Sequence, residues 1–303
     1  MNQRFGIIGA ESMIAQQAIK QFENQGIILT KADLTGNIPV DITSRESVQD
    51  FFRAHSQNFD WVILFSAYTD VGGAEKQKAE GEQSLCWRIN VDGVKNVVNA
   101  AREFGKKLVF ISTDFVFDGT SGPYKEKDPP GPNFSKVSFY GLTKIKGEEY
   151  IQNTLSMGHY IILRIAYPYS GVNTGKEDLI LKDVRWYKKG QPFALWTNHM
   201  IGPTYIPDIP RAISLIIKKK GTGIFHLGSP TITSSYGFAR ELLTKYEGKE
   251  IQLKKGKLTE SPGNHNPYPV TLNGGFIVKK IRAIGFDPTD WKKGIELSLA
   301  NLP

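Results

Sequence analysis

The chain has 303 residues, which exceeds the usual size of a single domain, so it is expected to form one large domain or two closely joined ones. Hydrophobic residues make up 40% and charged residues 22%, a balance typical of a packed globular protein and not of a disordered one. The net charge of +8 favours anionic partners such as nucleotides. No zinc-ligand spacing or arginine-rich arm accompanies the lysines, so we expect neither a nucleic-acid partner nor a metal site.

A single cysteine, Cys86, excludes an internal disulfide and is typical of a reducing compartment. It falls in a stretch of helical periodicity, where we expect a packed thiol and not a nucleophile. The first residues lack the pattern of a secretory signal peptide, and no apolar stretch is long enough to span a bilayer. The sequence therefore predicts a cytoplasmic protein with no membrane partner, and a homodimer is compatible with it.

Short apolar runs alternate with helical patterns through the first half of the chain. The runs that predict strands are 5–8, 27–30, 61–65, 108–112 and 160–165. The patterns that predict helices are 14–24, a stretch that begins at the capping-box sequence T-S-R-E (43–46), 84–104 and 140–154. In the second of these helices, Val48, Phe51, Phe52 and His55 fall on one face.

Strands that alternate with helices imply parallel pairing with right-handed crossovers, so the predicted fold is a doubly wound α/β sheet of the Rossmann type. After the last of these strands, proline and glycine interrupt the rhythm, although the run 224–227 can still join the sheet. We therefore expect a dinucleotide-binding domain at 1–167, to which 203–228 returns. The remaining parts, 168–202 and 229–303, are expected to form a smaller C-terminal substrate lobe over the carboxyl edge of the sheet.

The loop after the first strand reads G-A-E-S-M-I-A, from Gly9 to Ala15. Backbone N–H groups at the start of a helix, together with the helix dipole, attract a pyrophosphate. Of the three glycines usual in such a loop, only Gly9 is present, and Ser12 and Ala15 occupy the other two places. Alanine is a small steric change, and the serine hydroxyl can donate to a phosphate. Alone, this loop is consistent with a cofactor site or with a structural turn.

Two further segments carry side chains suited to carbonyl chemistry. I-S-T-D-F-V-F-D-G, at 111–119, follows the fourth strand, and Y-G-L-T-K, at 140–144, begins a helix. Tyr140 and Lys144 are four residues apart and so share one helix face. The ammonium of Lys144 is expected to lower the pKa of the Tyr140 phenol toward neutral pH, and the Thr113 hydroxyl is expected to orient a substrate carbonyl.

Together, these segments resemble an extended short-chain dehydrogenase/reductase, and in particular the dTDP-4-dehydrorhamnose reductase family, which includes the related regulatory β subunit of methionine adenosyltransferase. The likeness is strong to about residue 204 and weak beyond it. The matching motifs, in family order, are V-D-I-T from Val40, S-A-Y-T from Ser66, A-E from Ala74, I-N-V-D-G from Ile89, S-T-D-F-V-F-D-G from Ser112, Y-G-L-T-K from Tyr140, G-E from Gly147, L-R from Leu163 and G-P-T from Gly202.

The resemblance implies that Tyr140 is the proton donor, that Lys144 also holds the nicotinamide ribose, and that Thr113 completes the catalytic trio. The residues expected along the cofactor are Gly9, Ser12, Met13, Ile14, Lys31, Asp33, Asp41, Ile42, Ser66, Ala67, Tyr68, Asn90, Ser112, Tyr140 and Lys144. The residues expected in the sugar pocket are Thr69, Thr113, Phe115, Tyr167, Asn198 and His199. Asn90 is interpreted equally well as a buried structural amide, and His199 as an exposed loop residue.

The chain departs from related families at two places. Phe115 stands where related 4,6-dehydratases have an acid, which disfavours dehydration but leaves reduction intact. The reductases have an arginine-containing segment near the diphosphate of the substrate, whereas the comparable stretch here, N-P-Y-P-V-T-L-N at 266–273, has no arginine. Either the charge of the diphosphate is neutralised elsewhere, or the substrate is not a dTDP-sugar.

The stretch T-K-A-D, at 30–33, leaves two cofactors open. Asp33 can bind a ribose diol, which favours NADH, and Lys31 can pair with a 2′-phosphate, which favours NADPH. The basic charge of the protein and the resemblance favour NADPH slightly.

The sequence thus predicts an NADPH- or NADH-dependent reductase that acts on a keto group of a nucleotide-activated deoxysugar. Two alternatives stay open. One is a sugar-nucleotide epimerase that retains its NAD, and the other is a non-catalytic regulatory subunit that binds NADP.

Overall fold

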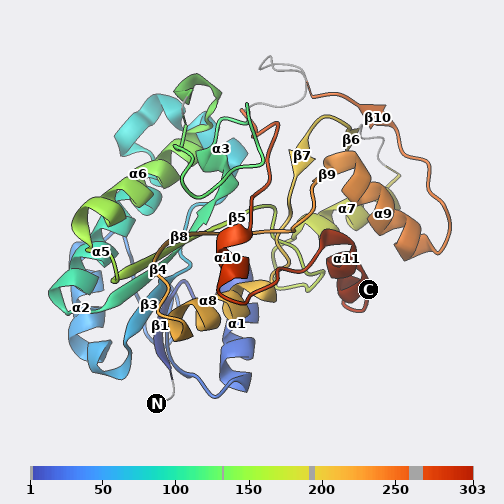
Figure 1. The fold of residues 1–303 in the computed structure, drawn as a ribbon. Coiled ribbons are helices and arrows are strands. Elements are labelled where there is room, and N and C mark those ends of the chain that lie inside the picture. The colour runs from blue at the N-terminus through green and yellow to red at the C-terminus, as the bar shows by residue number, and fades with distance from the viewer. Residues whose placement is uncertain (1–2, 132, 191–194, 259–268, 303) are drawn as a thin grey trace.

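The structure is a computed structural model that describes residues 3–131, 133–190, 195–258 and 269–302. Its centre is a six-stranded sheet whose strands run parallel in the order β2-β1-β3-β4-β5-β8 (Figure 1). The strands are β1 (Arg4–Ile8), β2 (Ile28–Ala32), β3 (Trp61–Leu64), β4 (Lys107–Thr113), β5 (Tyr160–Ile165) and β8 (Gly223–Leu227). The prediction of a doubly wound parallel sheet is confirmed, and the run 224–227 lies in its last strand.

Helices cover both faces of this sheet, and each face has its own apolar core. One face is covered by α1 (Met13–Asn24), α8 (Asp208–Lys218) and α10 (Lys279–Ala283), and the other by α2 (Arg45–His55), α5 (Val94–Glu103) and α6 (Phe139–Thr154) (Figure 1). Phe5 of β1 and Phe22 of α1, both fully buried, meet edge to face with ring centroids 5.1 Å apart. Burying each such ring stabilises the fold by ~1.5–3 kcal/mol, so the sheet is held between two helix layers.

Serine side chains begin several of these helices. Ser12, Ser44 and Ser138 each accept the backbone N–H three residues further on, which is the geometry of an N-cap. The capping box predicted at 43–46 is therefore wrong by one residue. Ser44 and not Thr43 caps α2, because the Thr43 hydroxyl donates to Asp41 at 2.7 Å.

The helical stretch predicted at 84–104 is not one regular helix. It consists of α4 (Leu85–Trp87), the π-helical segment η3 (Arg88–Gly93) and α5. A π-turn adds one residue to a helical turn and frequently occurs at functional sites. Asn90 lies within this segment and is buried, and its amide reaches Thr143 of α6 at 3.1 Å. The widened turn therefore places a buried amide between two helices.

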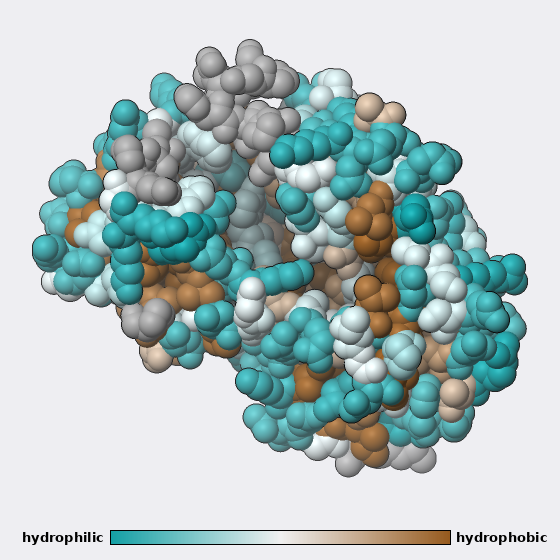
Figure 2. All heavy atoms as spheres, turned by 180° about the vertical axis from the view of Figure 1, so that it is seen from behind, coloured by the Kyte–Doolittle hydropathy of each residue, from teal (hydrophilic) through white to brown (hydrophobic). Residues whose placement is uncertain are grey.

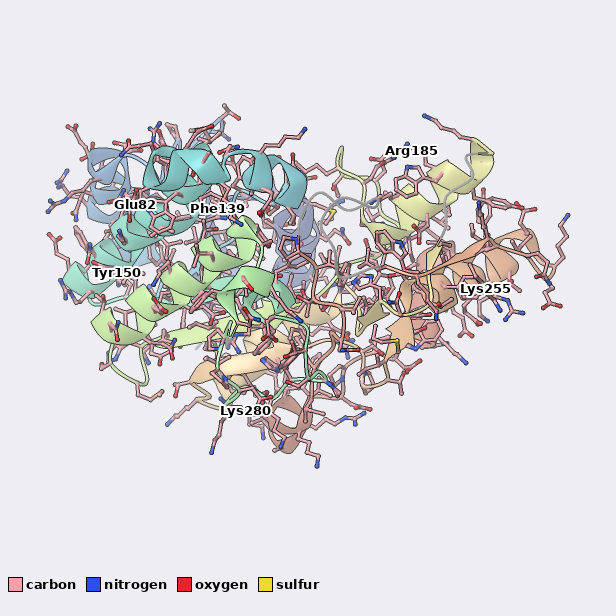
Figure 3. The ribbon with its side chains drawn as sticks, turned by 90° about the horizontal axis from the view of Figure 1, so that it is seen from above. Glu82, Phe139, Tyr150, Arg185, Lys255 and Lys280 are labelled. Atoms are coloured by element: carbon pink, nitrogen blue, oxygen red, sulfur yellow. The ribbon has the colours of Figure 1, made fainter. Side chains whose placement is uncertain are left out.

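A smaller lobe continues from the carboxyl end of β5 (Figure 1). Its helices are α7 (Leu179–Lys188), α9 (Ser235–Glu247) and α11 (Trp291–Leu299), and its short strands are β6 (Leu195–Trp196), β7 (Met200–Ile201), β9 (Thr233–Ser234) and β10 (Lys255–Gly256). An apolar core of its own includes Tyr169, Phe238 and Trp291. Seen from above, Phe139 of α6 lies on the side of the large sheet and Arg185 of α7 lies across from it on the lobe (Figure 3).

Short helical turns complete the described residues. They are η1 (Ser56–Asn58), α3 (Val71–Lys76), η2 (Lys78–Gln83), η4 (Asp114–Val116) and η5 (Phe134–Lys136). Within the residues that the structure describes, no helix combines the length and the apolar composition needed to cross a membrane. No group of three His, Cys, Asp or Glu side chains in this part of the chain is arranged to hold a metal ion.

Candidate active site

The strand order places the ends of β1 and β3 side by side, where the chain switches from one side of β1 to the other. In open α/β sheets, ligands bind in the crevice outside such a switch point. Gly9 follows β1 with a φ of 91°, a left-handed conformation that favours glycine. A Cβ added at Gly9 would lie 2.7 Å from Oγ of Ser66, which follows β3. The two loops therefore approach so closely that a side chain at position 9 would force them apart.

The residues after Gly9 open α1 and offer unpaired donors. Ser12 accepts the N–H of Ala15 at 3.3 Å, which leaves the hydroxyl hydrogen of Ser12 available to donate. The N–H groups of Met13 and Ile14 have no hydrogen-bond acceptor among the described residues. Such amides at the start of a 12-residue helix attract an anion. The loop therefore fits the pyrophosphate of a dinucleotide although two of the usual glycines are missing.

The end of β2 carries the two residues expected to distinguish NADH from NADPH. Asp33 accepts the N–H of Glu11 at 2.8 Å and that of Leu34 at 2.7 Å, so its carboxylate lies against the loop after β1. Lys31 instead pairs with Glu23 of α1 at 3.0 Å. The structure thus brings Asp33 to the loop and directs Lys31 toward the helix.

Asp41 and Ile42, expected near the adenine, make contacts within the protein. Asp41 Oδ1 accepts the N–H and the hydroxyl of Thr43 at 2.9 and 2.7 Å. Ile42 is buried and touches Gly93 of η3 so closely that a Cβ there would lie 2.8 Å from its side chain. Both residues stabilise the segment before α2, and their contact with adenine stays a prediction.

A buried amide joins the loop after β3 to α6. Asn90 Oδ1 accepts the N–H of Tyr68 at 2.9 Å, and Asn90 Nδ2 donates to the carbonyl oxygen of Tyr68 at 3.0 Å. The same Nδ2 donates to Thr143 Oγ1. Asn90 therefore holds the loop that contains Ser66 and Ala67 in position relative to α6, which is the structural interpretation of this residue. Contacts of these loop residues with a cofactor stay a prediction.

The two residues predicted to share one face of a helix lie in the first two turns of α6. Tyr140 and Lys144 are four residues apart near its N-terminus. A Cβ added at Gly141 would overlap the carbonyl oxygen of Phe115, so the start of α6 packs directly on the turn after β4. This close approach brings the Tyr140 phenol near Thr113, whose hydroxyl acts on the pKa of the phenol.

The phenol of Tyr140 is in an environment that disfavours its ionised form. Burial raises the pKa of Tyr140, and the charges of Asp114 and Cys86 raise it further, while the hydrogen bond from Thr113 lowers it. Lys144 is not among the groups that act on this pKa. The prediction that Lys144 lowers the pKa of Tyr140 is therefore wrong for this arrangement of side chains.

Lys144 is directed at the neighbouring strand. Its amine donates to the carbonyl oxygen of Ile111 at 2.7 Å and lies 3.9 Å from the centre of the Phe110 ring. Burial lowers the pKa of Lys144 to about 7, and the charges of Glu148 and Cys86 oppose this effect. A pKa near 7 lets the amine gain or lose a proton at neutral pH, which is typical of catalytic groups.

Three of the residues expected in the sugar pocket form a chain of contacts that starts at Tyr140. Phe115 packs edge to face on Tyr140 at 5.9 Å, and its ring centre lies 6.2 Å from that of Tyr167. The Tyr167 hydroxyl lies 2.9 Å from His199 Nε2, and His199 Nδ1 lies 2.5 Å from Ser235 Oγ. Tyr167 has a φ of 44°, a strained value for a residue other than glycine and one often found at functional sites.

The burial of His199, the contacts of Asn198 and the exposure of Thr69 bear on their predicted place in the sugar pocket. His199 is only 3% exposed, so its interpretation as an exposed loop residue is wrong. Burial lowers the pKa of His199 to about 4, which keeps the imidazole neutral at pH 7. Asn198 uses both polar atoms of its side chain on the backbone of Leu258, each at 2.8 Å, and Thr69 is exposed. Sugar contacts of Asn198 and Thr69 stay predictions.

A buried ion pair behind α6 joins Glu148 and Arg164, which lie in the recognised motifs G-E and L-R but to which the sequence assigns no role. Glu148 and Arg164, each 1% exposed, make two contacts at 3.0 and 2.6 Å. Ser112 donates to Glu148 at 2.5 Å, so this residue, expected along the cofactor, turns its hydroxyl to the pair. Arg164 also lies 3.3 Å from His226 of β8. The signal in the sequence is one arginine inside the apolar run Y-I-I-L-R-I at 160–165.

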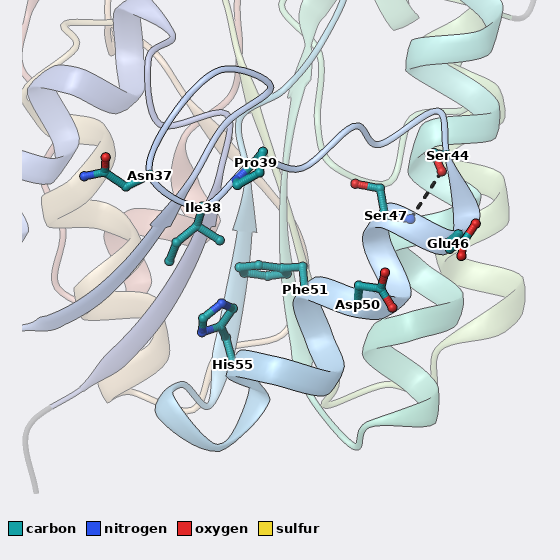
Figure 4. Close-up of a pocket in the computed structure, with 9 residues that line it drawn as sticks. All are labelled: Asn37, Ile38, Pro39, Ser44, Glu46, Ser47, Asp50, Phe51 and His55. Carbon is teal, nitrogen blue, oxygen red and sulfur yellow. Dashed lines mark hydrogen bonds between the residues drawn. The ribbon is translucent and has the colours of Figure 1, made fainter.

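The molecular surface has a hollow between the lobe and the large sheet and a separate depression beside α2. Seen from behind, the molecule is hollowed between the lobe and the large sheet (Figure 2). A separate depression, with a volume of about 620 Å³, lies beside α2 (Figure 4). Its lining residues are Asn37, Ile38, Pro39, Ser44, Glu46, Ser47, Asp50, Phe51 and His55. None of these residues is among those expected to bind the cofactor or the sugar, although the Ser47 hydroxyl accepts the N–H of Asp41 at 3.0 Å.

The fold and the arrangement around Tyr140 define the class of protein, an extended short-chain dehydrogenase/reductase. The model of the family described as RmlD substrate binding domain matches residues 4–303, and the chain therefore belongs to that family. The match covers the lobe as well as the sheet, although the motifs recognised in the sequence end near residue 204.

Curated relatives agree with this assignment. The dTDP-4-dehydrorhamnose reductase of Sinorhizobium fredii (strain NBRC 101917 / NGR234) is 29% identical over 272 residues, which cover 86% of this chain and 84% of that protein. The spore coat polysaccharide biosynthesis protein SpsK of Bacillus subtilis (strain 168) is 28% identical and covers 95% of this chain and 94% of its own. Methionine adenosyltransferase 2 subunit beta of Bos taurus is 30% identical, but over only 55% of this chain and 47% of that protein.

Solved structures share the fold over its whole length. The dTDP-4-dehydrorhamnose reductase of Bacillus anthracis in complex with NADP has a TM-score of 0.83 at 24% identity and covers 99% of this chain and 98% of its own. The orthologue from Clostridium acetobutylicum also has a TM-score of 0.83, at 25% identity, with 98% of this chain and 99% of that chain covered. The lobe is therefore part of the shared fold.

Proposed function

We propose that this protein is an NAD(P)H-dependent oxidoreductase that reduces the keto group of a nucleotide-activated deoxysugar, as its relatives named dTDP-4-dehydrorhamnose reductase do. The observation that carries the proposal is the approach of the Tyr140 phenol to Thr113 where α6 packs on the turn after β4, on the carboxyl side of a sheet whose first loop suits a pyrophosphate. The Sinorhizobium fredii relative, matched over 84% of its own length, supports the substrate class.

In this reaction, a bound reduced nicotinamide supplies a hydride to the carbonyl carbon. Thr113 donates a hydrogen bond to the carbonyl oxygen and orients it. Tyr140 gives its phenolic proton to the same oxygen as negative charge develops there. Lys144, whose amine donates to the carbonyl oxygen of Ile111 beside the site, would hold the nicotinamide ribose. Phe115 supplies no acidic group at the position where related 4,6-dehydratases have one, which agrees with reduction and not with dehydration.

We assign the pyrophosphate to Gly9, Ser12, Met13 and Ile14, and the free donors at the start of α1 support this assignment. NADPH is the reductant we favour, in keeping with the net charge of +8. Asp33 opposes this preference, because a carboxylate beside the loop after β1 would accept from a ribose diol and repel a 2′-phosphate. NADPH and NADH are therefore both expected to support turnover.

Different parts of the chain are proposed to bind the cofactor and the substrate. We assign cofactor binding to 1–167 and 203–228, and substrate binding to 168–202 and 229–303, except that the segment around α10 packs on the large sheet and not in the lobe. Of the arginine-free segment 266–273, residues 266–268 lie outside the described residues. Thr271 donates to the carbonyl oxygens of Asp114 and Phe117 at 3.3 and 3.2 Å, so this segment closes over the turn after β4. The charge of a diphosphate must then be met by cations outside the segment.

The direct test is Tyr140→Phe, with Tyr150→Phe as its matched control. Both tyrosines lie on α6, but Tyr150 lies ten residues further along the helix and its hydroxyl bonds to Asn99 at 2.9 Å. With a 4-keto-6-deoxy sugar nucleotide and NADPH, kcat of Tyr140→Phe is expected to fall about 100-fold or more, the usual contribution of a general acid. Tyr150→Phe is expected to keep the wild-type rate.

The alternatives give different outcomes in the same experiment. An epimerase releases about one NAD per chain on denaturation and oxidises no added NADPH. A regulatory subunit binds the cofactor and a heteromeric partner and turns over no keto-sugar. Equal rates for wild type and Tyr140→Phe contradict the assignment of Tyr140.

A further inference from the structure

Asp114 is a buried carboxyl group to which the proposed reaction assigns no role. It follows Thr113 at the carboxyl end of β4 and is only 1% exposed. Its Oδ1 accepts from Thr113 Oγ1 at 3.2 Å, whereas its Oδ2 is buried with no hydrogen-bond partner among the described residues. Burying an unpaired carboxylate oxygen is costly, and in a native structure such an atom calls for an explanation.

No cation is among the groups that shift the pKa of Asp114. From α6, Tyr140 lies close enough for the charge of Asp114 to raise its pKa. From the other side come Thr271, whose hydroxyl bonds to the Asp114 carbonyl oxygen, and Gly274, where an added Cβ would lie 3.6 Å from Oδ2. Burial raises the pKa of Asp114 to about 7, while hydrogen bonds from Thr113 and from nearby backbone amides lower it. The surroundings therefore favour the protonated carboxyl group.

Thr113 has one hydroxyl hydrogen and several candidates to receive it. Its Oγ1 already accepts the N–H of Phe115 at 3.2 Å, which leaves one lone pair and the hydrogen. The hydrogen can go to Asp114 Oδ1, to the Tyr140 oxygen or to a substrate carbonyl. A charged acceptor forms the stronger hydrogen bond, so an ionised Asp114 takes the hydrogen away from the substrate. A protonated Asp114 donates to the remaining lone pair of Thr113 and frees the hydrogen.

We propose that Asp114 acts as a neutral carboxylic acid that donates to Thr113 and so points the Thr113 hydroxyl hydrogen at the carbonyl oxygen of the substrate. This role rests on the proposed reductase function and makes Asp114 a positioning residue. The proton stays on Oδ1 throughout, and Oδ2 becomes a neutral carbonyl oxygen that is less costly to bury than a carboxylate oxygen.

The test compares Asp114→Asn with Asp114→Leu across pH. The asparagine amide donates to Thr113 at every pH, whereas leucine has no donor. At pH 6, Asp114→Asn is expected to keep kcat/KM within about threefold of wild type, and Asp114→Leu to lose about tenfold, the effect of one hydrogen bond. Near neutral pH, two groups of the wild type lose protons, Asp114 and Lys144. The plot of log kcat/KM against pH is therefore expected to fall more steeply between pH 6 and 8 in wild type than in either variant.

Equal slopes in wild type and Asp114→Asn overturn the positioning role, as do equal losses in Asp114→Asn and Asp114→Leu at pH 6. A second measurement is independent of activity. In protein labelled with ¹³C at the aspartate carboxyl carbon, Asp114 and Asp183 are both expected to titrate near neutral pH. The resonance that disappears in Asp114→Asn is the one that tests the proposal, and a wild type in which no such resonance titrates near neutral pH overturns it. A wild type that reduces no keto-sugar overturns the reductase function and this role together, whereas an active wild type with equal slopes overturns this role alone.

Discussion

The side chains at the centre of the site are held by backbone groups as much as by one another. Lys144 donates to the carbonyl oxygen of Ile111, and Thr113 accepts the N–H of Phe115. The backbone of β4 and of the turn after it thereby sets where both side chains lie. Because these groups are already ordered, less side-chain freedom is lost when ligands bind.

At the same scale, one carboxylate is expected to govern the choice of cofactor. Asp33→Asn removes a negative charge beside the loop after β1, while the amide oxygen can still accept the N–H of Glu11. Less repulsion of a 2′-phosphate is expected to raise the ratio of kcat/KM for NADPH over NADH several-fold. Initial rates with each reductant measure this ratio. Glu23→Gln, which frees Lys31 from its ion pair, is the comparison, and a ratio that changes only in Glu23→Gln would assign the selection to Lys31.

Spacing alone predicts which single residues share a helix face, but not where their polar atoms point. The four-residue interval places Tyr140 and Lys144 together on α6, as the structure has them. The direction of the Lys144 amine and the burial of Asp114 depend on contacts between segments far apart in sequence. Thr271, more than 150 residues further on, packs on the turn that contains Asp114. No local pattern around Asp114 indicates that neighbour.

At the scale of elements, the buried pair of Glu148 and Arg164 ties α6 to β5 directly behind Lys144. Glu148→Gln leaves the Arg164 guanidinium buried without a counter-charge and is expected to lower the free energy of unfolding by about 3–5 kcal/mol. Combining it with Arg164→Met is expected to restore most of this loss. Urea unfolding of the single and double variants measures both values.

The matched control for this prediction lies one residue away. Glu149 pairs with Lys146 at 2.8 Å on the half-exposed side of α6, so Glu149→Gln is expected to cost less than about 1 kcal/mol. Equal losses in Glu148→Gln and Glu149→Gln would mean that the buried pair contributes no more than a surface pair.

The strands are the elements that the sequence predicts best, because each is a compact apolar run between polar turns. The strand at 160–165 agrees with β5 in both bounds. The regular helix predicted at 84–104 is wrong in its middle, where η3 is π-helical. Helical periodicity continues on either side of the extra residue, so it does not reveal the widened turn. The buried contacts of Asn90 with Tyr68 and Thr143 show what the turn accommodates.

At the scale of the whole molecule, buried carboxyl groups are expected to make stability depend on pH. Asp183, in α7 of the lobe, is 5% exposed, and burial raises its pKa to about 7; Lys182 lowers it and Asp178 raises it. The folded protein therefore holds this proton more tightly than the unfolded chain, and the stability that it confers is lost as pH rises from about 4 to about 7. Asp183→Asn removes this loss.

The free energy of unfolding of Asp183→Asn is thus expected to exceed that of wild type at pH 8 and to approach it near pH 4. Because one pKa unit corresponds to about 1.4 kcal/mol, the difference at pH 8 is roughly 4 kcal/mol at most. Urea unfolding at pH 5 and pH 8 measures it. A difference that does not grow between these two pH values would show that Asp183 is ionised in the folded protein.

The lobe is the part of the molecule that the sequence describes least. Its core joins Tyr169, Phe238 and Trp291 from three distant segments, and its strands are two residues long, too short to leave a periodic pattern. Prolines and glycines mark its turns but not its partners. The match of the family over residues 4–303 shows that these segments nevertheless belong to one shared fold.

The transfer of hydride from a nicotinamide to a sugar carbonyl is tested most directly by following the hydrogen itself. NADPH that carries deuterium at the transferring position of the nicotinamide is incubated with the protein and a 4-keto-6-deoxy sugar nucleotide in ordinary water. The expected product is one mass unit heavier, with the deuterium on the former keto carbon. A product without deuterium, or no product while the cofactor is bound, would contradict the assignment of this protein as a reductase.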